Sequence, residues 1–366
     1  MNRFERQIAL QNIGVAGQAK IRAARVLVVG IGGLGNAVLP YLAAAGVGTI
    51  GLVDGDTIAL NNLNRQILFS ELHIGQKKAE VALALLKKQY TDIIWQSYPV
   101  FLTPDNIVDI LPHYDLVIDA TDNFATRYLI NDACFLWKKP WILGAIYRYE
   151  GQYAIFNVPQ QKGSYTCNYR DVYPQMPAPH EVPNCHETGV IGALVGIIGT
   201  MQAAEAIKYI AQIGNSQGNQ LYYYHFLENR WHSVGLSAHP KASQYLPKNI
   251  EELKQQPYAS LLCTMNSNRI ISWQKALAHY LALPKTTAWI DLRAAQEMPQ
   301  WTQTPYLRMA ISDIESQLDM LQPYETLLLF CQTGIRSNKA LGMLQQHFPD
   351  KEIFTLQGGI QNCILL

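Results

Sequence analysis

The chain has 366 residues, of which 16% are charged, and its formal net charge is +1. This length allows two domains and a sizeable core, while the near-neutral charge gives no field that would favour nucleic acid or an anionic membrane. The first 25 residues carry charges throughout and contain no apolar run, which argues against a secretory signal. Six cysteines without framework spacing favour a reduced, cytoplasmic setting.

After a helical lead-in over residues 3–22, predicted strands and helices alternate along the chain. The remaining expected elements of the first part are strands over 26–29, 50–53, 116–120 and 141–146, and helices over 33–45, 76–89 and 124–137. This order predicts an α/β fold with a Rossmann-like, doubly wound, mainly parallel sheet. Two later strands, 153–157 and 221–226, are expected to add to it in antiparallel fashion.

The second half of the chain contains two expected breaks. Residues 159–184 hold five prolines and few apolar runs, which predicts a long irregular loop before a buried helix over 190–204. A polar stretch near 214–250 separates a smaller α/β unit with strands over 288–292 and 326–330. We therefore expect domains over residues 1–238 and 246–366.

A Gly-rich turn follows the first strand and indicates a nucleotide site. Its sequence, GIGGLG, places Gly30, Gly32, Gly33 and Gly35 between a strand and a helix. Such a turn lets backbone N–H groups approach phosphate oxygens, and the helix N-terminus favours negative charge. Asp54 ends the next strand, where an acidic residue binds ribose hydroxyls in dinucleotide folds.

The residues beyond Asp54 fit phosphate chemistry better than hydride transfer. Asn62, Arg65 and Gln66 follow within about a dozen residues, Lys78 opens the next helix, and Asp122 follows a buried strand. Cations beside a triphosphate and a carboxylate for Mg²⁺ are what nucleotidyl transfer requires.

Several ordered motifs give these residues a family context. The segments GIGGLG, DGDTIALNNLNRQ, GQKKAE and DATDNFATR, with the helix GVIGALVGIIGTMQAAEAIK, resemble the ThiF/MoeB/HesA family, bacterial relatives of ubiquitin-activating enzymes. The resemblance covers residues 3–235.

The resemblance implies ATP and Mg²⁺ as cofactors and a role for each motif residue. The four glycines would form the phosphate turn, and Asp54 would bind the ribose. Asn62, Arg65 and Lys78 would contact the phosphates, with Gln66 beside them, and Asp122 would bind Mg²⁺. Arg6 matches an arginine that such homodimers supply to the ATP of the partner subunit.

Cys185 occupies the position of a family cysteine that, in some members, takes the activated carrier as a thioester or acyl persulfide. A small buried structural cysteine is the alternative. Many members also bind zinc through two CxxC pairs. This chain retains only Cys167 at the first pair, and the stretch GLSAHPKASQYL directly after Val234, where the second pair would fall, contains no cysteine. Four ligands cannot be assembled, so we predict no zinc.

The C-terminal unit resembles a rhodanese domain over residues 246–366. FCQTGIRS would form a loop of N–H donors around Cys331 as the sulfur-carrying residue, with Arg336 completing the loop, while WIDLR and LQGGI match other rhodanese motifs. The usual His-containing segment is absent, so a degenerate docking module is the alternative to an active domain.

Together these features predict an adenylyltransferase that activates the C-terminal Gly-Gly of a small ubiquitin-like sulfur-carrier protein, with sulfur transfer from Cys331 to form a thiocarboxylate. Implied partners are the carrier, a persulfide donor such as a cysteine desulfurase and a second copy of the chain, without nucleic acid or membrane. The alternatives are an NAD-dependent oxidoreductase and a non-catalytic carrier-binding scaffold. The pathway, whether molybdopterin synthesis, thiamine synthesis or tRNA thiolation, stays open.

Overall fold

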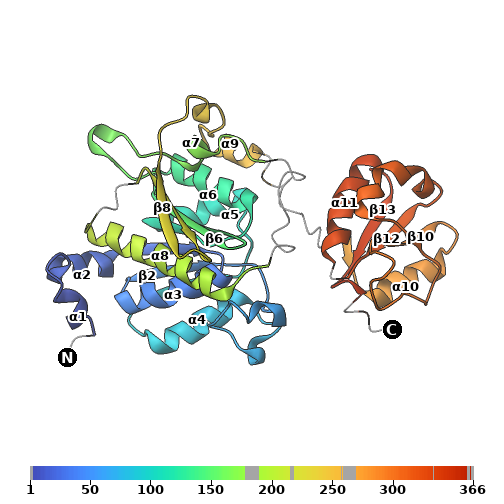
Figure 1. The fold of residues 1–366 in the computed structure, drawn as a ribbon, viewed down its shortest axis with the longest axis horizontal. Helices are drawn as coiled ribbons and strands as arrows, with labels where there is room; N and C mark the ends of the chain where they lie inside the picture. Colours follow the sequence, from blue (N-terminus) through green and yellow to red (C-terminus); the bar gives the residue numbers. More distant parts are fainter. Residues whose placement is uncertain are drawn as a thin grey trace. The chain divides into compact units, whose positions relative to one another are not determined.

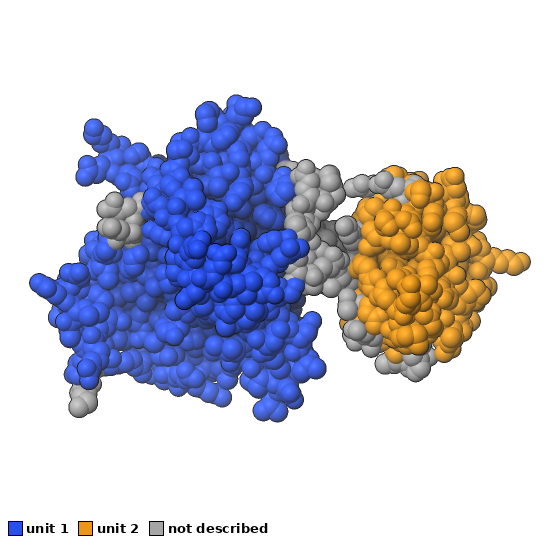
Figure 2. Space-filling model, in the orientation of Figure 1, with its two compact units in different colours: residues 1–258 blue, residues 259–366 orange. Residues whose placement is uncertain are grey.

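A computed structural model describes residues 3–177, 189–214, 218–256, 258, 269–332, 334–360 and 363, apart from the side chains at 315, 335, 339 and 346. The chain divides into two compact units, residues 1–258 and 259–366 (Figure 2). Each unit has its own sheet and its own buried clusters.

The first unit is built on an eight-stranded sheet with the strand order β3-β2-β1-β4-β5-β6-β7-β8 (Figure 1). The first five strands in this order are parallel, and β6, β7 and β8 are antiparallel to their neighbours. The strands are β1 Arg25–Val29, β2 Thr49–Val53, β3 Ile94–Tyr98, β4 Leu116–Asp119, β5 Trp141–Tyr147, β6 Glu150–Phe156, β7 Gln220–His225 and β8 Arg230–Gly235. The predicted Rossmann-like, mainly parallel sheet with antiparallel additions is therefore confirmed.

Helices cover both faces of this sheet. They are α1 Glu5–Ile8, α2 Gly14–Ala23, α3 Gly33–Ala45, α4 Lys78–Gln89, α5 Pro104–Ile110, α6 Phe124–Leu136, α7 Tyr169–Val172, α8 Gly192–Ala211 and α9 Ile250–Gln255. Alternate residues of β1 point to opposite faces: Val26 and Val28 join the cluster under α3 and α8, while Leu27 and Val29 join the cluster under α5 and α6. This period of two, with both faces buried, is what a central parallel strand requires.

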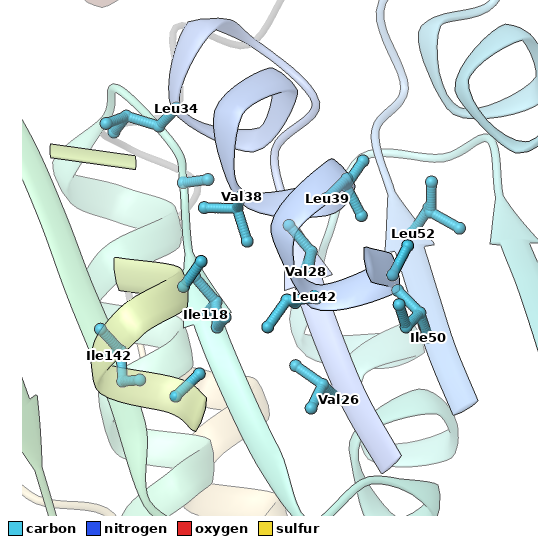
Figure 3. Packing of buried hydrophobic residues seen from close by; sticks show 14 of the residues in the cluster. Val26, Val28, Leu34, Val38, Leu39, Leu42, Ile50, Leu52, Ile118 and Ile142 are labelled. Atoms are coloured by element: carbon cyan, nitrogen blue, oxygen red, sulfur yellow. The ribbon is translucent and has the colours of Figure 1, made fainter. Parts of the chain in front are cut away.

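The apolar face of α3 fixes the turn that precedes it. Leu34, Val38, Leu39 and Leu42 pack over β1 and β2 (Figure 3). Burial of each such side chain stabilises the fold by about 1.5–3 kcal/mol. The helix ends at Gly46, whose φ of 88° gives the left-handed cap that favours glycine. A rigid α3 therefore holds the Gly-rich turn at the end of β1.

Residues 239–256 and Tyr258 belong to the first unit. Leu253 of α9 and Tyr258 are buried in the same cluster as α5 and α6. The Tyr258 hydroxyl donates to the Asp132 carboxylate at 2.5 Å, and Arg170 of α7 forms an ion pair with the same carboxylate at 2.6 Å. The structural division thus falls beyond residue 246, where we expected the second domain to begin.

The second unit contains a parallel sheet with the order β11-β10-β12-β13-β9. Its elements are β9 Ile270–Ile271, α10 Trp273–Ala282, β10 Thr287–Asp291, β11 Leu307–Arg308, β12 Thr326–Phe330, α11 Ile335–His347 and β13 Glu352–Leu356. Residues of α11 cover one face of this sheet, and an aromatic cluster that includes Trp273, Trp289 and Trp301 covers the other. The expected small α/β unit is confirmed. Within the described parts of both units, no helix combines the length and apolarity needed to cross a bilayer.

Candidate functional site

A cavity of about 680 Å³ opens at the carboxyl ends of β1, β2 and β4. In the strand order, β1 lies between β2 and β4. The connection after β1 therefore leads to a strand on one side of β1, and a later connection leads to a strand on its other side. Open α/β sheets bind ligands at this switch point. Of the predicted site residues, the following line the cavity: Gly30, Gly32, Gly33, Asp54, Asn62, Arg65, Gln66, Lys78 and Asp122.

The four glycines of the turn have different structural roles. A Cβ at Gly30, where φ is 91°, would lie 2.6 Å from the Ala120 carbonyl oxygen, and one at Gly35 would lie 2.1 Å from the Gly30 oxygen. A Cβ at Gly33 would lie 2.6 Å from the Val195 side chain of α8. Only at Gly32 is the space open, with Gln66 Nε2 nearest at 3.9 Å. Gly32 is therefore the position where a ligand can approach the backbone, and Gly35 serves packing.

Asp54 ties the end of β2 to the Gly-rich turn. One carboxylate oxygen accepts the Ile31 N–H at 2.7 Å, and the other accepts the Asp56 N–H at 2.8 Å. Burial raises the pKa of Asp54, and the charge of Lys78 and both backbone hydrogen bonds oppose that rise. Each oxygen retains a lone pair for a hydroxyl donor from a ligand.

Lys78 is buried at the start of α4 with its ammonium directed to the site. Its Nζ lies 2.8 Å from the Asp56 carboxylate, and Asp56 is itself exposed and lines the cavity. Arg65 Nη1 donates to the Asn61 carbonyl and to Asn64 Oδ1, each at 3.0 Å. These bonds hold two cations in the lining of the cavity.

Two buried amide oxygens in the cavity wall lack a partner among the described residues. Gln66 is 2% exposed, and its Oε1 makes no hydrogen bond. Gln152 Oε1 on β6 is also buried without a hydrogen-bond partner among the described residues, and Gln152 lines the same cavity. An unsatisfied buried oxygen costs about 1–3 kcal/mol, so these two atoms fit a site that a polar ligand completes.

The turn from β4 to α6 presents Asp122 at the cavity edge. Asp122 is exposed, and Asn123 caps α6 by accepting the Thr126 N–H at 2.8 Å. Behind them lies an ion pair that sequence reasoning missed: Arg127 Nε donates to the fully buried Asp119 carboxylate at 2.9 Å. Both belong to the quoted DATDNFATR motif, so their spacing was the available signal.

Arg127 also braces the backbone around the turn. Its Nη2 donates to the carbonyls of Thr121 and Gly144, on β5. Burial lowers the pKa of Arg127, but the interactions with Asp119 and Tyr169 together outweigh this effect, so the pKa is raised overall. The cation is therefore permanent and orients the turn that carries Asp122.

One wall of the cavity comes from segments that we did not assign to the site. Tyr147 and Arg148 at the β5–β6 hairpin line it, as do Tyr169 and Tyr173. The last two lie in and just after α7, a short helix within the stretch that we expected to be wholly irregular. That expectation is wrong for residues 169–172, where Asn168 caps the helix by accepting the Arg170 N–H at 2.9 Å.

Arg6 is exposed on α1 and does not line the cavity. Cys185 lies outside the described residues. The roles given to Arg6 and Cys185 stay predictions.

The segments in which the two CxxC pairs of a zinc site would lie are connected here by hydrogen bonds through Asn219. Cys167 is buried, and its N–H donates to Asn219 Oδ1 at 2.8 Å. The carbonyl of Asn219 accepts the Leu236 N–H at 2.9 Å, just beyond β8. In the described ranges, no group of three or more His, Cys, Asp or Glu side chains could hold a metal ion. The residues present do not fit a Cys₄ site.

In the second unit, Cys331 follows β12 and is fully buried. The Gly334 N–H donates to its Sγ at 3.1 Å, and Ser337 Oγ lies 3.8 Å away. Arg336 forms an ion pair with Glu297 at the same end of the unit. The structure therefore supplies one backbone donor to the sulfur from the described part of the loop.

Comparisons with known proteins agree with this geometry. A sequence model described as the ThiF family matches residues 4–245. "Probable adenylyltransferase/sulfurtransferase MoeZ" of Mycobacterium tuberculosis is 35% identical over 366 residues, covering 98% of this chain and 91% of that protein. "Sulfur carrier protein adenylyltransferase" of Thermus thermophilus is 42% identical over 241 residues, covering 66% of this chain and 89% of that protein. A crystal structure of E. coli MccB with MccA-N7isoASN matches with a TM-score of 0.57 and 25% identity, covering 66% of this chain and 74% of that one.

Proposed function

Because this chain belongs to the ThiF family, we propose that it activates the C-terminal Gly-Gly carboxylate of a ubiquitin-like sulfur-carrier protein with ATP and then transfers sulfur to it. The names of the relatives support adenylyltransferase activity on a sulfur carrier protein and adenylyltransferase activity coupled to sulfurtransferase activity. The observation that carries the proposal is the cavity beside Gly32, with Lys78 and Asp122 in its walls and two unpartnered oxygens.

Binding of ATP would use the end of β1 and the start of α3. The phosphates approach the backbone at Gly32, where no side chain intervenes and where the N-terminus of α3 favours negative charge. Asp54 accepts hydrogen bonds from the ribose hydroxyls through the lone pairs left by Ile31 and Asp56. Gln66 and Gln152 supply further acceptors for polar groups of the ligands.

The chemical step needs positive charge beside the α- and β-phosphates. A carboxylate oxygen of the carrier attacks the α-phosphorus, and the bond to the β-phosphate breaks as pyrophosphate leaves. Lys78 and Arg65, with the amide of Asn62, stabilise the charge that develops on the phosphate oxygens. The exposed Asp122 carboxylate fits a Mg²⁺ ligand, and this ion would neutralise phosphate charge when bound.

The second unit would supply sulfur through Cys331. The Gly334 N–H stabilises negative charge on the sulfur. The terminal sulfur of a Cys331 persulfide forms a bond to the acyl carbon as AMP leaves, and a second thiol releases the thiocarboxylate by forming a disulfide with Cys331. In a route through Cys185, its thiolate would displace AMP to hold the activated carrier as a thioester, and the terminal sulfur of the Cys331 persulfide would then displace that thiolate.

The proposal also includes partners. A persulfide donor such as a cysteine desulfurase would load Cys331, and a homodimer would place Arg6 near the ATP of the partner subunit. Linking the two activities in one chain raises the effective concentration of sulfur donor near the acyl-adenylate.

ATP–pyrophosphate exchange that depends on a Gly-Gly-ended carrier is the direct test, and absence of exchange with all such carriers would refute the proposal. An NAD-dependent oxidoreductase is the competing function. It predicts that NAD raises the melting temperature of the chain, whereas our proposal predicts that ATP with Mg²⁺ does so.

A further inference from the structure

The loop that holds Cys331 is closed by the segment of residues 294–301, which we call the facing segment. Gln332 Nε2 donates to the Met298 carbonyl at 3.0 Å. Arg336 donates to both carboxylate oxygens of Glu297, with Nη1–Oε1 at 2.6 Å. Cys331 is fully buried, and two residues of its loop, Gln332 and Arg336, bond to the facing segment.

Glu297 pairs with the Arg336 guanidinium, which would otherwise be free to bind an anion at the Cys331 loop. Arg336 lies two residues beyond Gly334, whose N–H donates to the Cys331 sulfur. The hydrogen bond to Glu297 is the main cause that raises the pKa of Arg336, and the charge of Cys331 adds to it. Glu297 is in turn fixed by the Ala294 N–H, which donates to its Oε1 at 2.8 Å. A two-point contact between guanidinium and carboxylate is among the stronger ionic contacts in proteins.

The guanidinium groups of Arg293 and Arg308, which lie in the same unit, also form ion pairs with a carboxylate. Arg293 contacts Gln332 at 3.3 Å, but its Nε and Nη2 donate to the fully buried Asp291. Arg308 donates to the same carboxylate at 3.2 Å. Of these three cations, Arg336 is the one whose carboxylate partner is partly exposed and lies in the facing segment.

We propose that Glu297 determines the sulfur-donor specificity of the second unit: by occupying Arg336, it excludes small anionic donors such as thiosulfate and leaves Cys331 selective for a persulfide presented by a protein. A small dianion binds through its charge alone, so it needs the Arg336 guanidinium and must displace the Glu297 carboxylate from it. A protein donor gains binding energy from its surface and does not need Arg336. This inference rests on the proposed role of Cys331.

The reaction with a small donor is simple to write. The Cys331 thiolate attacks the outer sulfur of thiosulfate, the new S–S bond forms, and sulfite leaves with the electron pair of the broken S–S bond. Cyanide then takes the outer sulfur as thiocyanate and restores the thiolate. This cycle needs no other reactant.

The test compares thiosulfate:cyanide sulfur transfer by the full chain and by Glu297→Gln, which keeps the shape of the side chain and removes its charge. We expect kcat/KM for thiosulfate to rise about tenfold or more, chiefly through a lower KM. The reason is that the Arg336 guanidinium, no longer held by a carboxylate, can bind the dianion. Asp350→Asn, at an exposed position between α11 and β13, is the matched control and should not change the rate. Adding Arg336→Ala to Glu297→Gln should abolish the gain.

Two results would overturn the inference: an unchanged kcat/KM for thiosulfate in Glu297→Gln, or a gain that persists when Arg336→Ala is added. Alkylation of Cys331, followed by peptide mass spectrometry, gives a second readout that needs no turnover. Glu297→Gln should raise the rate with anionic iodoacetate more than the rate with neutral iodoacetamide, and an equal rise would show only a change of access. Pyrophosphate exchange by the first unit is measured in parallel, so failure of the adenylation proposal is seen separately.

Discussion

Alanine substitutions at three glycines of the first unit distinguish a glycine that leaves room for the ligand from a glycine that the packing of the fold requires. Gly32 has φ −72° and ψ −154°, which alanine adopts without strain, and its Cβ would meet nothing nearer than 3.9 Å. We expect Gly32→Ala to keep the free energy of unfolding within about 0.5 kcal/mol of wild type. Its methyl group would occupy the space of the phosphates, so ATP affinity should fall about tenfold or more, which is about 1.4 kcal/mol.

Gly35→Ala should show the opposite pattern. Its Cβ would lie 2.1 Å from the Gly30 oxygen, so backbone must shift at a cost of about 3 kcal/mol. At about 2–4 °C per kcal/mol for a unit of this size, the melting temperature should fall by about 6–12 °C. Gly196→Ala, in α8 with no atom within 4 Å of its Cβ, is the control and should raise the melting temperature by about 2–4 °C through helix propensity.

Scanning calorimetry of the full chain, with and without ATP and Mg²⁺, measures both effects, and the transition that ATP shifts identifies the first unit. The reasoning would be refuted if Gly32→Ala bound ATP as tightly as wild type while Gly35→Ala melted at the wild-type temperature.

Further variants test the ion pairs and the site. Asp132→Ala leaves the buried Arg170 unpaired and should cost about 3–5 kcal/mol in urea unfolding of the first unit; a loss below about 1 kcal/mol would contradict the importance of this pair. The pKa of Glu297 is lowered to about 2 by the hydrogen bonds from Arg336, so its stabilisation of the second unit is complete above its ordinary value of 4.5 and is lost as pH falls towards 2. The melting temperature of wild type should therefore exceed that of Glu297→Gln at pH 6, with the difference shrinking through this window, and a difference independent of pH would exclude the ionic cause. Asp122→Asn should leave the melting temperature unchanged because the side chain is exposed, yet reduce pyrophosphate exchange about a hundredfold; retained exchange would place the metal elsewhere.

The core of the fold could be predicted because its signals are local. The helix predicted over residues 33–45 has the same bounds as α3, since an apolar run follows the Gly-rich turn and Gly46 ends it. The central strands β1, β2 and β4 are continuous apolar runs, as buried parallel strands require.

The edge strands gave no such signal. Every residue of β8 is exposed, and β3 contains no fully buried residue, so neither shows an apolar run. Pairing with a neighbour, not burial, defines these strands: β3 pairs with β2, which is distant in the sequence, and β8 pairs with β7, which directly precedes it.

Prediction of the site was limited in a related way. Gly32, Asp54, Lys78 and Asp122 lie in motifs near strand ends, and the parallel sheet brings those ends together. Gln152 reaches the same cavity from the antiparallel hairpin, and no motif indicated it.

The contacts of the second unit were equally hidden. Arg336 was expected to complete the Cys331 loop, but its partner Glu297 lies 39 residues away in a segment without a motif. Interactions over such distances depend on the folded chain, so only the structure could reveal them.

The most direct test of the two-step account follows the C-terminus of the carrier by mass spectrometry during incubation with the full chain, ATP, Mg²⁺ and a persulfide donor. The account predicts a thiocarboxylate with the wild-type chain. With Cys331→Ser it predicts carrier-dependent pyrophosphate exchange without thiocarboxylate. A thiocarboxylate formed at the wild-type rate by Cys331→Ser, or a lack of exchange by the wild-type chain, would contradict it.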